Sequence, residues 1–274
     1  MTNFHKRLDK LRAQMGTLNL DCLYITKITN VKYMTGFTGS AGQFILTEKE
    51  AIFLTDSRYT EQSQRQVKNA QVHIIEKGYV SLIQKLNVFK SGMKVGFESI
   101  HTSVKLYNNI NKDFEKIKFI PTEELVENLA AVKDMDEIKS LKAAIEITDT
   151  VFDEILSEMK EGAIEKNIAA KISYLFKLNG ADGDSFDTII ASGIFSALPH
   201  ASPSDKAFEK GDFVVMDFGA KFEGYHADMT RTVVVGEATD RHREIYDIVL
   251  GSNLAGISAA KAGVTGAFVD SACR

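Results

Sequence analysis

The stretch Met216–Gly236, MDFGAKFEGYHADMTRTVVVG, decides the fold of the second half of the chain. It lies across two β-branched and aromatic runs, FVVMDFG and MTRTVVVG, which predict two buried strands. Asp217 lies near the end of the first run, and Asp228 precedes the second. The segment AKFEGY between them is predicted to be a turn, because Gly224 permits a tight reversal. The two strands are therefore expected to pair antiparallel and to aim both carboxylates into one space.

Two carboxylates in such an apolar setting need compensation, because an ionised carboxylate that is buried without a partner is strongly disfavoured. Two neighbouring anions also repel, so one must be protonated or a cation must lie between them. Oxygen ligands favour a hard divalent ion such as manganese or magnesium. The structural alternative has Asp217 capping a turn and Asp228 paired with Arg231. Both aspartates together, inside apolar strands, favour a metal site.

Three residues near Asp228 belong to the same constellation. Thr230 shares a strand face with Asp228, so its hydroxyl is expected to orient that carboxylate. Arg231 is expected to point to the opposite face, which suits a structural ion pair at least as well as a role in the site. His226 also shares the face of Asp228, and its spacing leaves a role as a ligand open.

His200 is a further candidate, in the segment SALPHASPSD between Pro199 and Pro203. Loops held rigid in this way often carry functional groups. A lone histidine is more often a surface or hydrogen-bonded residue, so the loop alone does not assign His200 a role.

The hydrophobic pattern changes near residue 130. Before that point strand-like and helical segments alternate, which predicts an α/β domain over residues 1–130. After it, a long amphipathic helix over residues 134–160 and a second helix over 165–178 precede the strands. This order predicts a second, α+β domain over residues 131–274.

The second domain begins to repeat itself. The sequence Lys160-Glu-Gly-Ala returns as Lys261-Ala-Gly-Val, 101 residues further on (261 − 160 = 101). Each copy follows a long amphipathic helix. If the unit is duplicated, the sequence stops at Arg274 before its second set of strands, so we expect an incomplete repeat.

Composition narrows the classes of protein. The 274 residues are 44% hydrophobic and carry a formal net charge of −4, which gives no electrostatic footprint for nucleic acid or an anionic membrane. No apolar run approaches the roughly 18 residues that a membrane helix needs. The first residues are charged and helix-patterned, unlike a signal peptide. Cys22 and Cys273 lack metal-type spacing, which predicts two reduced thiols in a cytoplasmic protein.

The run DFGAKFEGYHADMTRTVVVG resembles the first metal motif of the pita-bread metallopeptidases, Asp-x-Gly followed by Gly-Tyr-x-x-Asp-x-Thr-Arg-Thr. The segment SFDTIIASG, followed by His200, is similar to the segment that precedes this motif. TGFTGSAG and TDSRYTEQ resemble the creatinase-like N-terminal domain of Xaa-Pro aminopeptidases and Xaa-Pro dipeptidases. The resemblance covers nearly the whole chain. It implies an α/β creatinase-like domain followed by an incomplete α+β pita-bread domain.

The resemblance also implies a function, the hydrolysis of the bond before proline in Xaa-Pro peptides. Asp217 and Asp228 would be metal ligands, with Asp228 bridging two divalent ions, usually manganese. Thr230 and Arg231 would support these ligands. His200 would contact the substrate and help to stabilise the tetrahedral intermediate. The expected partners are proline-containing peptides and, in a homodimer, a second copy of the chain.

The family supplies one more histidine and two glutamates as metal ligands, which this chain does not contain. The resemblance therefore implies a C-terminally truncated sequence with an incomplete site. Two other classes stay open. One is a creatinase-type hydrolase that works without metal, against which the two aspartates argue. The other is a non-catalytic pita-bread protein that binds a partner, which the missing ligands favour.

Overall fold

The computed structural model describes residues 4–274. The chain forms two compact units, and the division falls between Asp134 and Met135. Each unit has its own hydrophobic core. No helix among residues 4–274 combines the length and the apolar character needed to cross a membrane.

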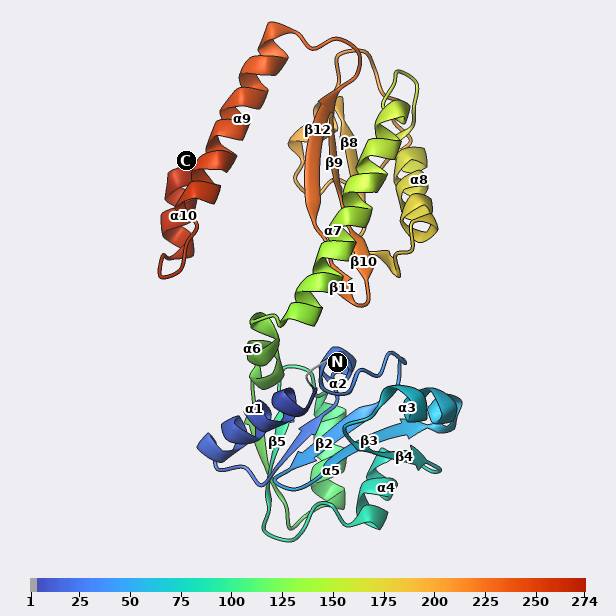
Figure 1. The fold of residues 1–274 in the computed structure, drawn as a ribbon, viewed down its shortest axis with the longest axis vertical. Helices are drawn as coiled ribbons and strands as arrows, with labels where there is room; N and C mark the ends of the chain where they lie inside the picture. Colours follow the sequence, from blue (N-terminus) through green and yellow to red (C-terminus); the bar gives the residue numbers. More distant parts are fainter. Residues whose placement is uncertain (1–3) are drawn as a thin grey trace. The chain divides into compact units, whose positions relative to one another are not determined.

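The first unit is an α/β domain built on a six-stranded mixed sheet, in the order β4-β3-β2-β1-β5-β6 (Figure 1). Its strands are β1 (Cys22–Ile25), β2 (Gln43–Thr47), β3 (Ala51–Asp56), β4 (Gln71–Ile75), β5 (Lys94–Glu98) and β6 (Lys118–Thr122). Its helices are α1 (Phe4–Thr17), α2 (Ile28–Thr35), α3 (Thr60–Gln66), α4 (Tyr79–Leu86), α5 (Val104–Asp113) and α6 (Leu125–Ala131), with a 3-10 turn, η1 (Ser57–Tyr59), before α3. The outer pairs β3–β4 and β5–β6 are parallel, whereas β1–β2 and β2–β3 are antiparallel.

Both faces of this sheet are buried, as alternate residues of β1 show. Leu23 and Ile25 pack in one core with residues of α1, α2 and α6. Cys22 and Tyr24 pack in a second core with residues of α4 and α5. A strand that is covered on both faces needs apolar residues at every position, which explains continuous runs such as AIFLT. The predicted α/β class of this unit is confirmed.

The second unit places two helices and a 3-10 turn before its strands. These are α7 (Met135–Ile155), η2 (Leu156–Glu158) and α8 (Glu165–Leu178). One sheet has the order β12-β9-β8, with β8 (Ile189–Ser192), β9 (Phe213–Phe218) and β12 (Met229–Val234) all antiparallel. A turn, η3 (Gly193–Ala197), follows β8, and the helices α9 (Asp240–Ala259) and α10 (Gly266–Cys273) follow β12.

Strand β9 is buried on one face only. Val214, Met216 and Phe218 enter the core that α7 and α8 cover, whereas Phe213, Val215 and Asp217 face the other way and stay half-exposed. The prediction of fully buried strands is therefore wrong for this face, and Asp228 is exposed. The run FVVMDFG has apolar residues on both faces, so hydrophobicity alone hides the alternation.

The segment AKFEGY is more than the predicted turn. It forms most of a hairpin, β10 (Ala220–Phe222) and β11 (Tyr225–His226), which belongs to a second small sheet of order β11-β10-β7 with β7 (Gly183–Asp184). Glu223 and Gly224 at the tip both have positive φ, 52° and 85°. Residues of this kind close two-residue hairpins, so the reversal at Gly224 was predicted correctly although the strands around it were not.

Candidate metal centre

Asp217 sits at the centre of the sheet β12-β9-β8. It lies opposite Thr230 on one side and opposite Ile189 on the other. The Thr230 side chain lies close enough to the Asp217 carboxyl to lower the pKa of that carboxyl. The sequence assigned the Thr230 hydroxyl to Asp228, but Asp228 precedes β12 and lies outside the strand, so the argument from strand alternation does not apply to it.

A close approach of two backbone segments brings Asp228 to Asp217. A Cβ atom on Gly219 would lie 1.9 Å from the Ala227 carbonyl oxygen and 3.2 Å from the Asp228 nitrogen. The Ala227 N–H donates to the Ala220 carbonyl at 2.9 Å. Only glycine allows the chain that leaves β9 to pass so near the chain that enters β12. Gly219 therefore determines how close the backbone at Asp228 lies to the chain that leaves β9.

The Asp217 carboxyl is under electrostatic strain. Burial raises its pKa, and the Asp228 charge raises it too, while the Thr230 side chain and His200 lower it in part. Its Oδ1 is buried and has no hydrogen-bond partner. A buried oxygen without a donor is costly, and a bound cation would remove that cost.

His200 lies on the exposed connection between η3 and β9 and acts electrostatically on Asp217. Ser196, in the preceding turn η3, lines a pocket together with Asp228 and Thr230, whereas His200 does not line it. The structure thus brings His200 within electrostatic reach of Asp217, although the two are separate in sequence.

His226 does not line this pocket, whereas Arg231 lines it together with Asp228. The His226 ring nitrogen Nδ1 lies 3.1 Å from the Ser185 carbonyl oxygen. The Arg231 guanidinium donates to the Thr230 carbonyl at 2.9 Å and lies 5.9 Å from the ring centroid of Phe152 in α7. The ion pair suggested for Arg231 is therefore replaced by a cation–π contact.

The pocket beside the aspartates has a volume of about 990 Å³. Residues of β9 and β12 form one side, including Val215, Asp228 and Thr230, and α9 adds apolar side chains such as Ile245 and Val249. Its size is at the upper end of the roughly 300–1,000 Å³ typical of ligand sites. It has room for a short peptide.

The donor set suits a hard divalent ion but does not enclose it. The two aspartates offer carboxylate oxygens, the ligands that manganese and magnesium prefer. Within residues 4–274 no group of three or more His, Cys, Asp or Glu side chains is placed to hold a metal ion. These residues can therefore supply part of a coordination shell, and the unpaired Oδ1 of Asp217 is the atom that most needs one.

Glu165 was not found by sequence reasoning. It is the first residue of α8, 1% exposed, and its carboxylate hydrogen-bonds Ser192 and Ser204. An acidic residue in the first turn of a helix is common, so its position carried no distinctive signal. The two serines stand 27 and 39 residues away in sequence, and only the fold brings them to it.

Each of the two units matches a known protein family. The creatinase/prolidase N-terminal domain matches residues 7–132, and metallopeptidase family M24 matches residues 139–274. An uncharacterized peptidase of Bacillus subtilis is 43% identical over 98% of this chain and 76% of its own length. The chain belongs to metallopeptidase family M24.

Solved structures agree with the M24 assignment. A Xaa-Pro dipeptidase from Bacillus anthracis superposes with a TM-score of 0.89 at 37% identity, covering 99% of this chain and 76% of that one. An X-Pro aminopeptidase from Thermotoga maritima gives a TM-score of 0.86 at 36% identity, covering 93% and 74%. The predicted fold, a creatinase-like domain followed by a pita-bread domain, is confirmed.

The close approach at Gly219 predicts that this M24 chain will not tolerate a side chain there. Gly219→Ala should destabilise the protein by an amount near the upper end of the roughly 1–3 kcal/mol typical of overpacked sites. It should also weaken manganese binding, because Ala227 and the adjoining Asp228 must move. Urea unfolding and manganese titration measure the two effects.

Gly251→Ala is the matched control, since a Cβ atom on Gly251 meets nothing within 4 Å. Gly251 lies inside α9, where alanine should stabilise by about 0.5–1 kcal/mol. Wild-type stability and metal binding in the Gly219 variant would contradict the role given to this contact.

Asp217→Asn should stabilise the metal-free protein at neutral pH. The raised pKa means that the fold favours the protonated carboxyl, so stability is lost as pH rises from the unfolded value toward the folded pKa and stays lost above it. The neutral amide removes this cost. The gain over wild type should shrink as pH falls toward the unfolded value of about 3.9. Thermal unfolding with chelator, from pH 4 to 8, measures it; a variant less stable than wild type at pH 7 would refute the assignment.

Proposed function

We propose that the protein is a metal-dependent peptidase that hydrolyses the bond before proline in Xaa-Pro peptides. Asp217 carries this proposal, because its oxygen Oδ1 is buried without a partner and its carboxyl lies near Asp228, which lines a peptide-sized pocket. A purely structural aspartate would have its oxygens satisfied by protein donors.

Relatives support proline as the second residue of the substrate. The similar structures from Bacillus anthracis and Thermotoga maritima are named for Xaa-Pro dipeptidase and X-Pro aminopeptidase activity, respectively. The two names differ in the length of peptide cleaved. The bond before proline is a tertiary amide without an N–H, so a site for it needs no acceptor at the scissile nitrogen.

In this function Asp217 and Asp228 would supply part of the ligand shell of two divalent ions, for which we propose manganese. Bound there, the ions supply Lewis-acid activation of water and of the scissile carbonyl. Thr230 orients the Asp217 carboxylate through its hydroxyl. His200 donates a hydrogen bond to the substrate carbonyl oxygen as negative charge develops on it. The apolar side chains from α9 form the wall against which the peptide lies.

The two alternative classes are less well supported by the site. A creatinase-type hydrolase without metal would have no use for an unpaired carboxylate oxygen next to a second carboxylate. A non-catalytic binding protein would gain nothing from a charge arrangement that strains the fold. Location in the cytoplasm and assembly as a homodimer remain predictions from the sequence.

The activity is tested with purified protein on Ala-Pro and Ala-Ala substrates. We expect manganese-dependent cleavage of Ala-Pro at a rate well above that of Ala-Ala, and loss of cleavage on addition of a chelator. Magnesium or zinc in place of manganese tests the choice of ion. Equal rates on the two substrates, or activity that survives the chelator, would sink the proposed function.

A pair of variants separates the metal ligand from its support. Asp228→Asn should abolish metal-dependent cleavage, because it removes a charge that the ions need. Thr230→Val keeps the shape of the side chain and loses only the hydroxyl, so it should cost roughly 10–100-fold in metal affinity or activity. Manganese titration and turnover on Ala-Pro rank the two. If Thr230→Val proved the more damaging, Asp228 would not be a ligand.

A further inference from the structure

The Glu165 side chain is almost fully enclosed, with 1% of its surface exposed. A buried carboxylate is stable only when its oxygens are met by donors or cations. Burial alone would raise the pKa of Glu165, but hydrogen bonds from Ser204 and Ser192 outweigh it and hold the pKa below its usual range. The group is therefore a charged carboxylate at neutral pH, held by neutral donors.

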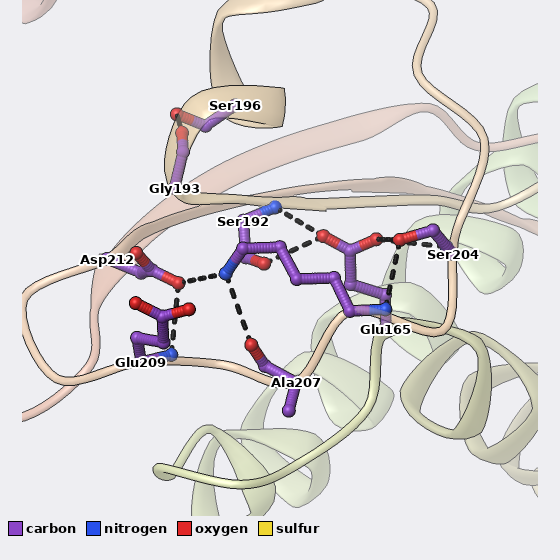
Figure 2. A network of polar contacts seen from close by, with 9 residues as sticks. Glu165, Ser192, Gly193, Ser196, Ser204, Ala207, Glu209 and Asp212 are labelled. Atoms are coloured by element: carbon purple, nitrogen blue, oxygen red, sulfur yellow. Dashed lines mark hydrogen bonds and ion pairs between the residues drawn. The ribbon is translucent and has the colours of Figure 1, made fainter.

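Four hydrogen bonds satisfy this carboxylate, two to each oxygen (Figure 2). Oε1 accepts from the Ser192 backbone N–H and hydroxyl, both at 2.7 Å. Oε2 accepts from the Ser204 backbone N–H at 2.9 Å and from its hydroxyl at 2.6 Å. Hydrogen bonds to a charged group are among the stronger ones in proteins.

Ser192 and Ser204 mark the two ends of the segment 193–203, which includes η3 and His200. One carboxylate therefore ties together both ends of the connection that carries His200. The backbone of α8 adds to the tie at the second end, because Lys166 donates its N–H to the Ser204 carbonyl at 3.2 Å.

Between its ends the segment has little support of its own. Its hydrogen bonds are local: the Ser196 hydroxyl donates to the Gly193 carbonyl, and the Leu198 N–H donates to the Phe195 carbonyl. Ile194 and Leu198 are 80% and 53% exposed. A segment with so few buried contacts depends on its anchors for a fixed position.

A second anchor lies just beyond Ser204. The Lys206 ammonium group forms an ion pair with Asp212 at 2.5 Å and donates to the Ala207 carbonyl at 3.1 Å. Asp212 also accepts from the Glu209 N–H at 3.0 Å. This pair holds the return of the chain toward β9 and leaves the span between Ser192 and Ser204 to Glu165.

We infer that Glu165 is a positioning residue for His200: through Ser192 and Ser204 it fixes the segment 193–203 beside Asp217 and Asp228. The effect on turnover rests on the proposed function, whereas the effect on the segment does not. Glu165 acts on His200 through its hydrogen bonds to Ser192 and Ser204.

Glu165→Gln tests the inference with nearly unchanged volume. An amide has a single oxygen acceptor, and its NH₂ group would face a backbone N–H at one of the two serines. A serine hydroxyl can turn to accept, but a backbone N–H cannot. One end of the segment thus loses one of its anchors. Glu158→Gln is the control, since Glu158 bonds through a single oxygen, to Lys171 at 2.6 Å, without touching the segment.

Amide hydrogen exchange on metal-free protein gives the first measurement. In Glu165→Gln the segment 193–203 should exchange roughly tenfold faster or more, while β9 and β12 keep wild-type protection. The control should leave both regions unchanged. Unchanged exchange of the segment in Glu165→Gln would overturn the inference. If that variant does not fold, Ser204→Ala replaces it, and we expect a smaller increase in the exchange rate of the segment. An unchanged exchange rate in Ser204→Ala would then contradict the inference.

A double-mutant cycle on Ala-Pro turnover gives the second measurement. Glu165→Gln should lower kcat roughly tenfold with KM little changed, because His200 acts on developing charge. Once His200→Ala is present, Glu165→Gln should cost nothing further in kcat. Additive losses would show a general structural role and overturn the inference. If the protein shows no turnover, the proposed function fails, and the exchange of segment 193–203 alone decides this one.

Discussion

The antiparallel pairing of β9 with β12 is the interaction on which the second unit depends. It sets Thr230 opposite Asp217 and, with Ile189 on the other side, places a carboxylate in the middle of a three-stranded sheet. The pairing forms only because Gly219 lets two backbone segments pass within a distance that any side chain would block. The register of β9 and β12, the geometry of the metal site and the need for glycine at position 219 therefore depend on one another.

Two carboxylates in this unit show opposite solutions to burial. Glu165 has donors for both oxygens and holds the surrounding loop in place. Asp217 keeps one oxygen without a donor and shares its space with Asp228, so the fold bears a cost there. Proteins keep such costs where a ligand will relieve them. The satisfied carboxylate builds the scaffold, and the unsatisfied one is where a cation would act.

Much of this could be predicted from the sequence, and the failures have physical causes. The helix over residues 165–178 follows from local periodicity, and the antiparallel strands around Asp217 follow from two β-branched and aromatic runs with a glycine turn between them. The strands β10 and β11 were missed because strands of three and two residues are too short for a period to show. The place of Thr230 opposite Asp217 was not foreseen, because strand alternation related Thr230 to Asp228, which precedes the strand. The Glu165 network was invisible because its parts meet only in the folded chain.

The hairpin between β9 and β12 also limits where insertions and deletions can be accepted during evolution. Residues inserted as a pair at the tip, around Glu223, would extend β10 and β11 outward and leave Ala227 in place. A single insertion between His226 and Met229 would slide β12 by one position and turn Thr230 away from Asp217. Length variation among descendants of this sequence is therefore expected to gather at the hairpin tip and to be absent beside Asp228.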